Sequence, residues 1–385
     1  MMRRGCALAP VMLACCAPPQ AAGAPWAGSM ELETGLRSQA PGARRDTRAS
    51  LELGWEGRLG TDWRFKLADR FEHFGGNERR SINTVKDAYL SWNGSAESAI
   101  DIGRVNLRQG VATGYNPSDY FRARAVRAIV SVDPEKLRRS RSGTYMVQGQ
   151  RVWDGGSLSA VLAPRIGHDE DSTNAVARAM LAGSVRLAPD FQPQALLLLE
   201  EGAAPQFGLN LSALLGDAVS AHAEWSGGRQ RDLLARALDR PGEAAWRNRL
   251  AAGATFTAAN GLSLTAEYHW CGAALDGAQW AALAQQPGQY WRYRSFVQRE
   301  QEPPTREAAF AMLLWPDALR PRLDWSAILK RDLQDRSMLL WSELRWRLDR
   351  ADIALQWTHL RGRSGAQYAA YGERNSWRLM AQWYW

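Results

Sequence analysis

The chain has 385 residues, a net charge of +8 and a mean hydropathy of −0.39, yet it contains 18 Trp and 10 Tyr. It has no apolar run approaching 18 residues, which excludes membrane-spanning helices. Cys271 is the only cysteine after residue 16, which excludes C-x-x-C metal or redox pairs there. The positive balance favours partners that are anions.

The N-terminus predicts a secretory signal peptide over residues 1–24. A cationic start at Met1–Arg4 precedes an apolar stretch, Cys6–Ala17, and a small-residue run ending at Ala24. The apolar stretch is shorter than the ~20 residues that a spanning helix needs. Lipid attachment through Cys15 or Cys16 is the alternative. We expect the secreted chain to be residues 25–385.

Apolar and charged residues alternate with period two along most of the secreted chain. Leu51, Leu53 and Trp55, for example, share one strand face, and Glu52 and Glu56 share the other. We expect strands at 29–38, 47–59, 62–72, 83–93, 97–105, 143–153, 156–165, 177–188, 193–201, 206–215, 217–225, 246–258, 262–270, 307–315, 321–331, 336–348, 351–360 and 375–385. This gives 18 strands, or 16 if 193–201 and 307–315 are not strands.

The connections between these strands alternate in length. Every second one is short, at 60–62, 93–96, 154–156, 189–193, 216, 259–261, 316–321 and 349–350. The others include long polar stretches, at 38–47, 72–83, 106–142, 166–177, 226–245, 271–306 and 361–375. Short periplasmic turns opposite long extracellular loops are typical of outer-membrane barrels. We therefore predict an all-β, transmembrane, antiparallel up-and-down barrel, with apolar faces toward lipid and charged faces toward the lumen. A soluble sandwich or solenoid explains this asymmetry less well.

The connection at 106–142 is the third long loop of this barrel and the most basic one. A loop folded into the lumen would present guanidinium groups, which bind carboxylate or phosphate through paired hydrogen bonds. An outward loop binding lipopolysaccharide phosphates is the alternative. The candidate constriction residues on this loop are Arg108, Asp119, Arg122, Arg124, Arg127, Arg138 and Arg139.

The stretch Gly103-Arg104-Val105-Asn106-Leu107-Arg108-Gln109-Gly110 resembles the G-R-x-x-x-R-x-G stretch of alginate-export-type and related porin-like barrels. The resemblance covers about eight residues and the Asn116-Pro117 that follows. It implies an 18-stranded barrel and an Arg-rich lumen selective for a polyanion. By the same resemblance, Arg104 and Arg108 would face the lumen.

The alternation of inward and outward residues along a strand adds further candidates for the lumen. Arg345 and Arg347 share a strand face with Glu343, opposite Leu344 and Trp346. A wall with both signs of charge would orient and filter polar solutes, although such charges also pair simply to satisfy one another.

An enzyme or an adhesin that uses the long loops is the competing class of function. None of the five histidines lies in an H-E-x-x-H or comparable motif, so we expect no catalytic residue, no metal and no cofactor. The long insertion at 271–306 contains a helical pattern and could be a lid over the mouth or a helix on the rim.

The final strand gives the most specific clue. Trp377, Leu379, Ala381, Trp383 and Trp385 lie on one face, where only an apolar medium stabilises them. This pattern resembles the terminal strand of Gram-negative outer-membrane barrels, which the assembly machinery reads. The assembly-signal candidates are Trp377, Leu379, Trp383 and Trp385.

The sequence thus predicts a passive outer-membrane channel for small anionic solutes. The expected partners are membrane lipid, lipopolysaccharide, the assembly machinery, the solutes and two further copies of the chain in a trimer, with no nucleic acid. An exporter of an acidic polysaccharide, or an outer-membrane enzyme or adhesin, is the alternative.

Overall fold

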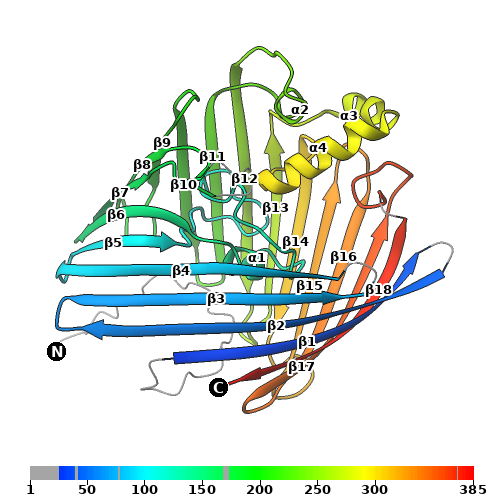
Figure 1. Ribbon diagram of the computed structural model, residues 1–385, viewed down its shortest axis with the longest axis horizontal. Coiled ribbons are helices and arrows are strands. Elements are labelled where there is room, and N and C mark those ends of the chain that lie inside the picture. The colour runs from blue at the N-terminus through cyan, green and yellow to red at the C-terminus, as the bar shows by residue number, and fades with distance from the viewer. Residues whose placement is uncertain (1–25, 40–41, 77–78, 168–172, 371) are drawn as a thin grey trace.

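The computed structural model describes residues 26–39, 42–76, 79–167, 173–370 and 372–385. Within these residues the chain forms 18 strands and four short helices (Figure 1). The expected signal peptide lies outside them. The strands are β1 (Trp26–Gln39), β2 (Gly42–Leu59), β3 (Trp63–Gly75), β4 (Arg80–Ser95), β5 (Ser98–Val105), β6 (Thr144–Trp153), β7 (Gly156–Ala163), β8 (Arg178–Val185), β9 (Gln194–Glu200), β10 (Gln206–Leu215), β11 (Val219–Gln230), β12 (Ala245–Thr257), β13 (Ser263–Cys271), β14 (Glu307–Trp315), β15 (Leu323–Asp332), β16 (Met338–Arg347), β17 (Ala351–Arg361) and β18 (Glu373–Tyr384).

The sheet closes on itself. Each strand pairs antiparallel with its neighbours in sequence, and β1 pairs with both β2 and β18. Met30 lies opposite Leu51 in β2 and opposite Trp383 in β18. A closed sheet leaves no edge with unpaired amides. The prediction of an 18-stranded antiparallel barrel is confirmed.

Alternation along each strand separates an outer and an inner face. On β3 the outward Phe71 is 45% exposed, whereas the inward Glu72 is 1% exposed. The same outward parity leaves large apolar side chains exposed on nearly every strand. A soluble surface rarely carries so continuous an apolar area, so the outer face suits a hydrocarbon environment.

The connections differ between the two ends of the barrel, as the sequence predicts. At the short-turn end they include 60–62, 96–97, 154–155 and 348–350, and at the long-connection end they include 106–143, 231–244 and 272–306.

Two of the predicted long connections were wrong. The stretch 38–47 belongs mostly to β1 and β2, and 72–83 belongs mostly to β3 and β4. Their polar residues read as loops in the sequence, but they pair across the hairpins. Asp46, for example, accepts from Arg37 at 2.9 Å between β2 and β1.

All four helices lie in long connections. They are α1 (Pro134–Arg139), α2 (Leu233–Ala237), α3 (Gly277–Ala284) and α4 (Pro287–Glu300). Helices α2, α3 and α4 lie together at one end of the barrel (Figure 1). They enclose a buried cluster that includes Leu233, Leu275, Trp280, Tyr290 and Tyr293, so the insertion at 271–306 has a packed core of its own. No helix in the described ranges is both long and apolar enough to cross a membrane.

Candidate functional site

The connection between β5 and β6, residues 106–143, runs inside the barrel and is called the inner loop here. It contacts strands on the far side of the lumen. The Ser118 hydroxyl lies 2.8 Å from the side-chain oxygen of Asn210 of β10, and Lys136 lies 3.4 Å from Glu343 of β16. These contacts place the loop across the lumen and exclude the alternative in which it points outward.

Glu224, an inward-facing residue of β11, holds the first part of the inner loop. Its carboxylate accepts the backbone N–H groups of Val111, Ala112 and Ser118 at 2.9, 3.1 and 2.8 Å. Glu224 is 0% exposed. A buried carboxylate is stable only where donors replace water, and here the loop backbone supplies them.

Glu267 of β13 forms a second anchor beside the first. It accepts the backbone N–H groups of Thr113 and Gly114 at 2.6 and 2.8 Å, and Nε2 of His222 and His269 at 2.8 and 2.9 Å. Because a carboxylate only accepts, both rings carry a proton on Nε2. A Cβ on Gly114 would lie 2.8 Å from the His269 ring, so glycine permits this close approach.

Glu302, two residues after α4, joins the middle of the inner loop to the helices at the long-connection end. It accepts from Arg122 at 2.8 Å and from the Tyr115 hydroxyl at 2.7 Å, and Arg249 of β12 lies 3.0 Å away. We call this group the Glu302 junction.

A second contact follows the junction along the loop. The backbone N–H of Arg124 donates to the carbonyl oxygen of Arg299 at 2.8 Å, and its guanidinium donates to Glu300 at 3.3 Å. The inner loop is therefore fixed to α4 by both backbone and side chains.

The Glu302 junction is charged at neutral pH. Burial opposes ionisation of Glu302, but Arg122 and Arg249 hold its pKa below the ordinary value. Burial also lowers the pKa of Arg122, yet Glu302 and other anions raise it overall. Burial and the charge of Glu302 raise the pKa of the Tyr115 hydroxyl well above its usual range, so Tyr115 remains a donor.

The lumen beside β5–β9 is filled by apolar side chains. Tyr120 and Phe121 of the inner loop pack on inward-facing residues of these strands, namely Val105, Met146, Val161, Ala163, Met180, Ala182, Leu196 and Leu198. The expectation that apolar faces meet only lipid is therefore wrong for β6–β9, where the inner face is also apolar. Any aqueous path through the lumen would therefore have to avoid this packed side.

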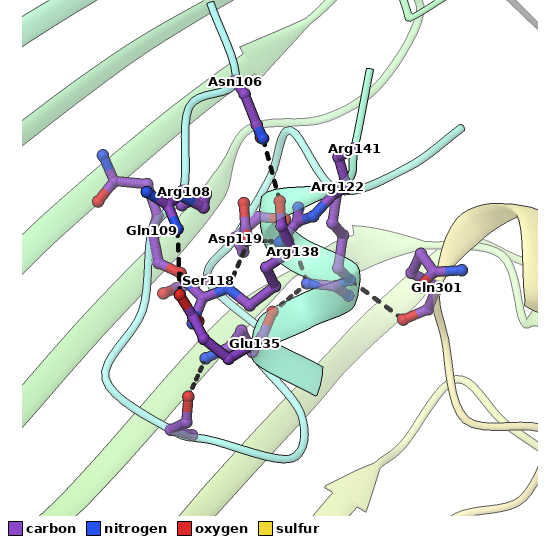
Figure 2. Close-up of polar contacts among 12 residues, drawn as sticks. Asn106, Arg108, Gln109, Ser118, Asp119, Arg122, Glu135, Arg138, Arg141 and Gln301 are labelled. Atoms are coloured by element: carbon purple, nitrogen blue, oxygen red, sulfur yellow. Dashed lines mark hydrogen bonds and ion pairs between the residues drawn. The ribbon is translucent and has the colours of Figure 1, made fainter. Parts of the chain in front are cut away.

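Four arginines of the inner loop share two carboxylates around α1. Figure 2 labels three of these arginines, Arg108, Arg138 and Arg141. This α1 charge cluster consists of Arg108, Asp119, Glu135, Arg138, Arg139 and Arg141. Arg141 donates to Asp119 at 2.7 Å, and Arg108 and Arg139 donate to Glu135 at 3.1 and 3.0 Å. Arg138 lies 3.9 Å from both carboxylates. The cluster therefore carries two positive charges in excess.

The members of the α1 charge cluster differ in how far their side chains are exposed to solvent. Asp119 is fully buried, and the Arg141 side chain is 4% exposed. The Arg108 and Arg139 side chains are 41% and 43% exposed. Arg108 and Arg139 are therefore the most solvent-exposed arginines of the cluster.

Four of the other predicted lumenal arginines are paired. Arg345 contacts Glu343 at 2.9 Å and Asp352 at 3.0 Å. Arg347 contacts Asp317 at 2.8 Å in the 316–322 connection, at the short-turn end. Arg122 and Arg124 are held by Glu302 and Glu300, as described above, and Arg127 is exposed.

Arg104 does not lie where the resemblance placed it. The register of β5 puts it on the same face as Ile102, which is 50% exposed on the outside of the barrel. Its guanidinium lies over the ring of Tyr145, which is also outward-facing, and donates to the carbonyl oxygen of Gly143 at 2.8 Å. Arg104 therefore supports the loop exit and does not line the lumen.

The sequence reading missed an ion-pair network on the wall formed by β1–β3. Arg48 contacts Glu31 at 2.5 Å, Glu33 at 2.8 Å and Glu72 at 3.2 Å, and its side chain is 6% exposed. Glu31 and Glu33 alternate with outward apolar residues, and this pattern could have indicated the network. The pairing itself depends on register between strands, which one sequence does not reveal.

The aromatic face of the last strand points outward as expected. Trp377 and Leu379 are each 51% exposed, Trp383 is 43% exposed and Trp385 is 47% exposed.

Comparison with known proteins gives matches in structure alone. No family model matches the chain, and no curated protein matches it. Solved structures with the same fold include Pseudomonas aeruginosa OpdQ, with a TM-score of 0.57, 12% identity, and coverage of 94% of this chain and 98% of that one. Acinetobacter baumannii OccAB1 gives a TM-score of 0.56 at 11% identity, with 94% and 96% covered. Pseudomonas aeruginosa OccK5 (OpdH) gives 0.57 at 9% identity, with 93% and 97% covered.

These neighbours are outer-membrane porins of Gram-negative bacteria. The likeness shows that this chain has the same closed, 18-stranded fold. The finer resemblance to alginate-export-type barrels is not confirmed.

Proposed function

We propose that the protein is a passive outer-membrane channel for small anionic solutes, with the inner loop as its constriction. The observation that supports this most directly is the α1 charge cluster. It lies on a loop held across the lumen, and its exposed members, Arg108 and Arg139, have more positive charge around them than nearby carboxylates neutralise. Guanidinium groups stay charged at any physiological pH and match the geometry of carboxylate or phosphate.

The path for solutes is inferred from what fills the lumen. Apolar packing occupies the side of β5–β9. We infer that the remaining passage runs between α1 and the charged wall of β1–β3, because Lys136 of α1 already contacts Glu343 of β16 at 3.4 Å. A loop fixed by Glu224, Glu267 and Glu302 keeps this passage narrow, which favours small solutes over a polysaccharide chain.

The remaining partners are proposals of the same kind. The exposed apolar outer face of the strands, called the apolar belt, suits outer-membrane lipid. Lipopolysaccharide would surround the rim of the barrel at the long-connection end. The outward face of Trp377, Leu379, Trp383 and Trp385 suits recognition by the assembly machinery. A homotrimer would cover part of the apolar belt. Diffusion through the channel requires no cofactor, no metal and no catalytic residue.

Zero-current potentials in planar bilayers under a KCl gradient test the function. We expect a zero-current potential whose sign indicates selectivity for chloride over potassium. The double variant Arg108→Gln/Arg139→Gln should move it toward zero, whereas Arg165→Gln, at an exposed arginine of the 164–177 connection, should leave it unchanged. A cation-selective pore would refute the anion preference, and absence of conductance would refute the channel.

A further inference from the structure

Glu135 occupies the position that an anionic solute would take. Its carboxylate accepts from Arg108 at 3.1 Å and from Arg139 at 3.0 Å, so one carboxylate bridges two guanidinium groups. Figure 2 labels Arg108 and Glu135. Arg108 comes from the chain just after β5, whereas Glu135 and Arg139 lie one turn apart on α1. The two donors therefore converge from separate segments.

The bridge is open to the lumen. The side chains of Glu135, Arg108 and Arg139 are 35%, 41% and 43% exposed. By contrast, Asp119 and Arg141, the other ion pair of the cluster, are 0% and 4% exposed. The Glu135 carboxylate can rotate into water without unfolding the loop, and Asp119 cannot.

We propose that Glu135 is a resident competitor: it holds the Arg108–Arg139 site while the channel is empty, and a solute carboxylate or phosphate displaces it in passing. This inference rests on the proposed channel function. Exposed ion pairs are weak, so a solute anion competes at little cost. Glu135 returns when the solute leaves, and the two guanidinium groups are never unpaired. A site that binds and also releases is what fast conduction requires.

The variant Glu135→Gln tests the proposal, because glutamine preserves the shape but removes the competing charge. The measurement is single-channel conductance against the concentration of potassium acetate, and separately of potassium phosphate. In Glu135→Gln the solute no longer competes with an exposed ion pair, so we expect the half-saturating concentration to fall about two- to fivefold. A fall with acetate alone would assign the site to carboxylates, and a fall with phosphate alone would assign it to phosphates.

Glu56→Gln is the matched control. Glu56 is an inward-facing carboxylate of β2 that is exposed and pairs with Lys66 at 3.1 Å. The variant removes the same charge away from α1. An equal effect of Glu56→Gln, or an unchanged half-saturating concentration in Glu135→Gln for both salts, overturns the proposal.

A second variant covers the case in which Glu135→Gln does not fold. Arg139→Gln removes one arm of the site and should raise the half-saturating concentration. No rise in this variant also contradicts the proposal. If the unaltered protein conducts no current, the channel function itself has failed, and the two failures are thereby distinguished.

Discussion

Ser118 donates both its backbone N–H and its hydroxyl to the same oxygen of Glu224, at 2.8 and 2.9 Å. The two residues are 106 positions apart in the sequence, and both are fully buried. This contact fixes the first part of the inner loop to the opposite wall. The position of the proposed constriction therefore depends in part on one carboxylate of β11.

Glu224→Gln should loosen the inner loop. The amide keeps one acceptor oxygen, but its NH2 group faces backbone donors that it cannot satisfy. Each lost hydrogen bond to a charged acceptor costs about 1.5–3 kcal/mol. We expect noisier single-channel current with more frequent changes of conductance level.

The control for this variant is Glu243→Gln, at an exposed carboxylate of the 231–244 connection. It should leave the current noise unchanged. A Glu224→Gln channel as quiet as the unaltered one would show that the loop does not depend on this anchor.

Glu302→Gln should destabilise the protein more than it alters selectivity. The substitution leaves Arg122 and Arg249 buried without their shared carboxylate, and breaking a buried pair costs about 3–5 kcal/mol. The measurement is the free energy of unfolding in urea for the protein refolded in lipid vesicles. If adding Arg122→Gln to Glu302→Gln restores part of the free energy of unfolding, the cause is electrostatic. If Glu302→Gln alone lowers that free energy by less than about 1 kcal/mol, this account of the junction is contradicted.

Acid should weaken the same junction. Arg122 and Arg249 lower the pKa of Glu302 in the folded protein, so its contribution to stability is complete above the ordinary value of 4.5. That contribution decreases as the pH falls from 4.5 through the folded pKa. Unfolding free energies measured from pH 7 to pH 3 should decline more steeply for the unaltered protein than for Glu302→Gln. Equal slopes would exclude Glu302 as a source of acid sensitivity.

Neighbouring residues of β8 test the apolar filling of the lumen. Met180 faces inward and is 1% exposed, whereas Leu181 faces outward and is 50% exposed. Met180→Ala should cost about 2–5 kcal/mol of unfolding free energy, because it leaves a cavity against the inner loop. Leu181→Ala should cost less, since lipid fills the space. The reverse order would mean that the inner face of β8 is not packed.

The strands were largely predictable because each carries its own period-two signal. All 18 expected strands are present, and most boundaries differ by a few residues. The hairpins of β1–β2 and β3–β4 were the errors in the connections, because polar residues such as Asp46 look like loop residues until they pair across the hairpin.

The site was less predictable, because its partners are distant in sequence. Arg108 and Arg139 were candidates from the basic composition of the loop, and Arg108 also from the resemblance, but nothing local indicates that Glu224 or Glu302 holds the loop. The apolar residues on both faces of β7–β9, such as Val161 beside Leu162, were a usable signal. A strand that is apolar on both faces must be covered on both, which could have indicated a loop inside the barrel.

The backbones of Gly28 and Trp385 exchange two hydrogen bonds, each 3.1 Å long. The first and last strands are thus ordinary neighbours, and the seam between them is as continuous as any other pair in the wall. A short linker joining residues 26 and 385, with new ends opened between residues 154 and 155, would preserve every strand pair. In such a circular permutant the aromatic strand would lie in the middle of the chain. The permutant would therefore show whether this strand acts by closing the barrel wall or by being recognised as a C-terminal segment.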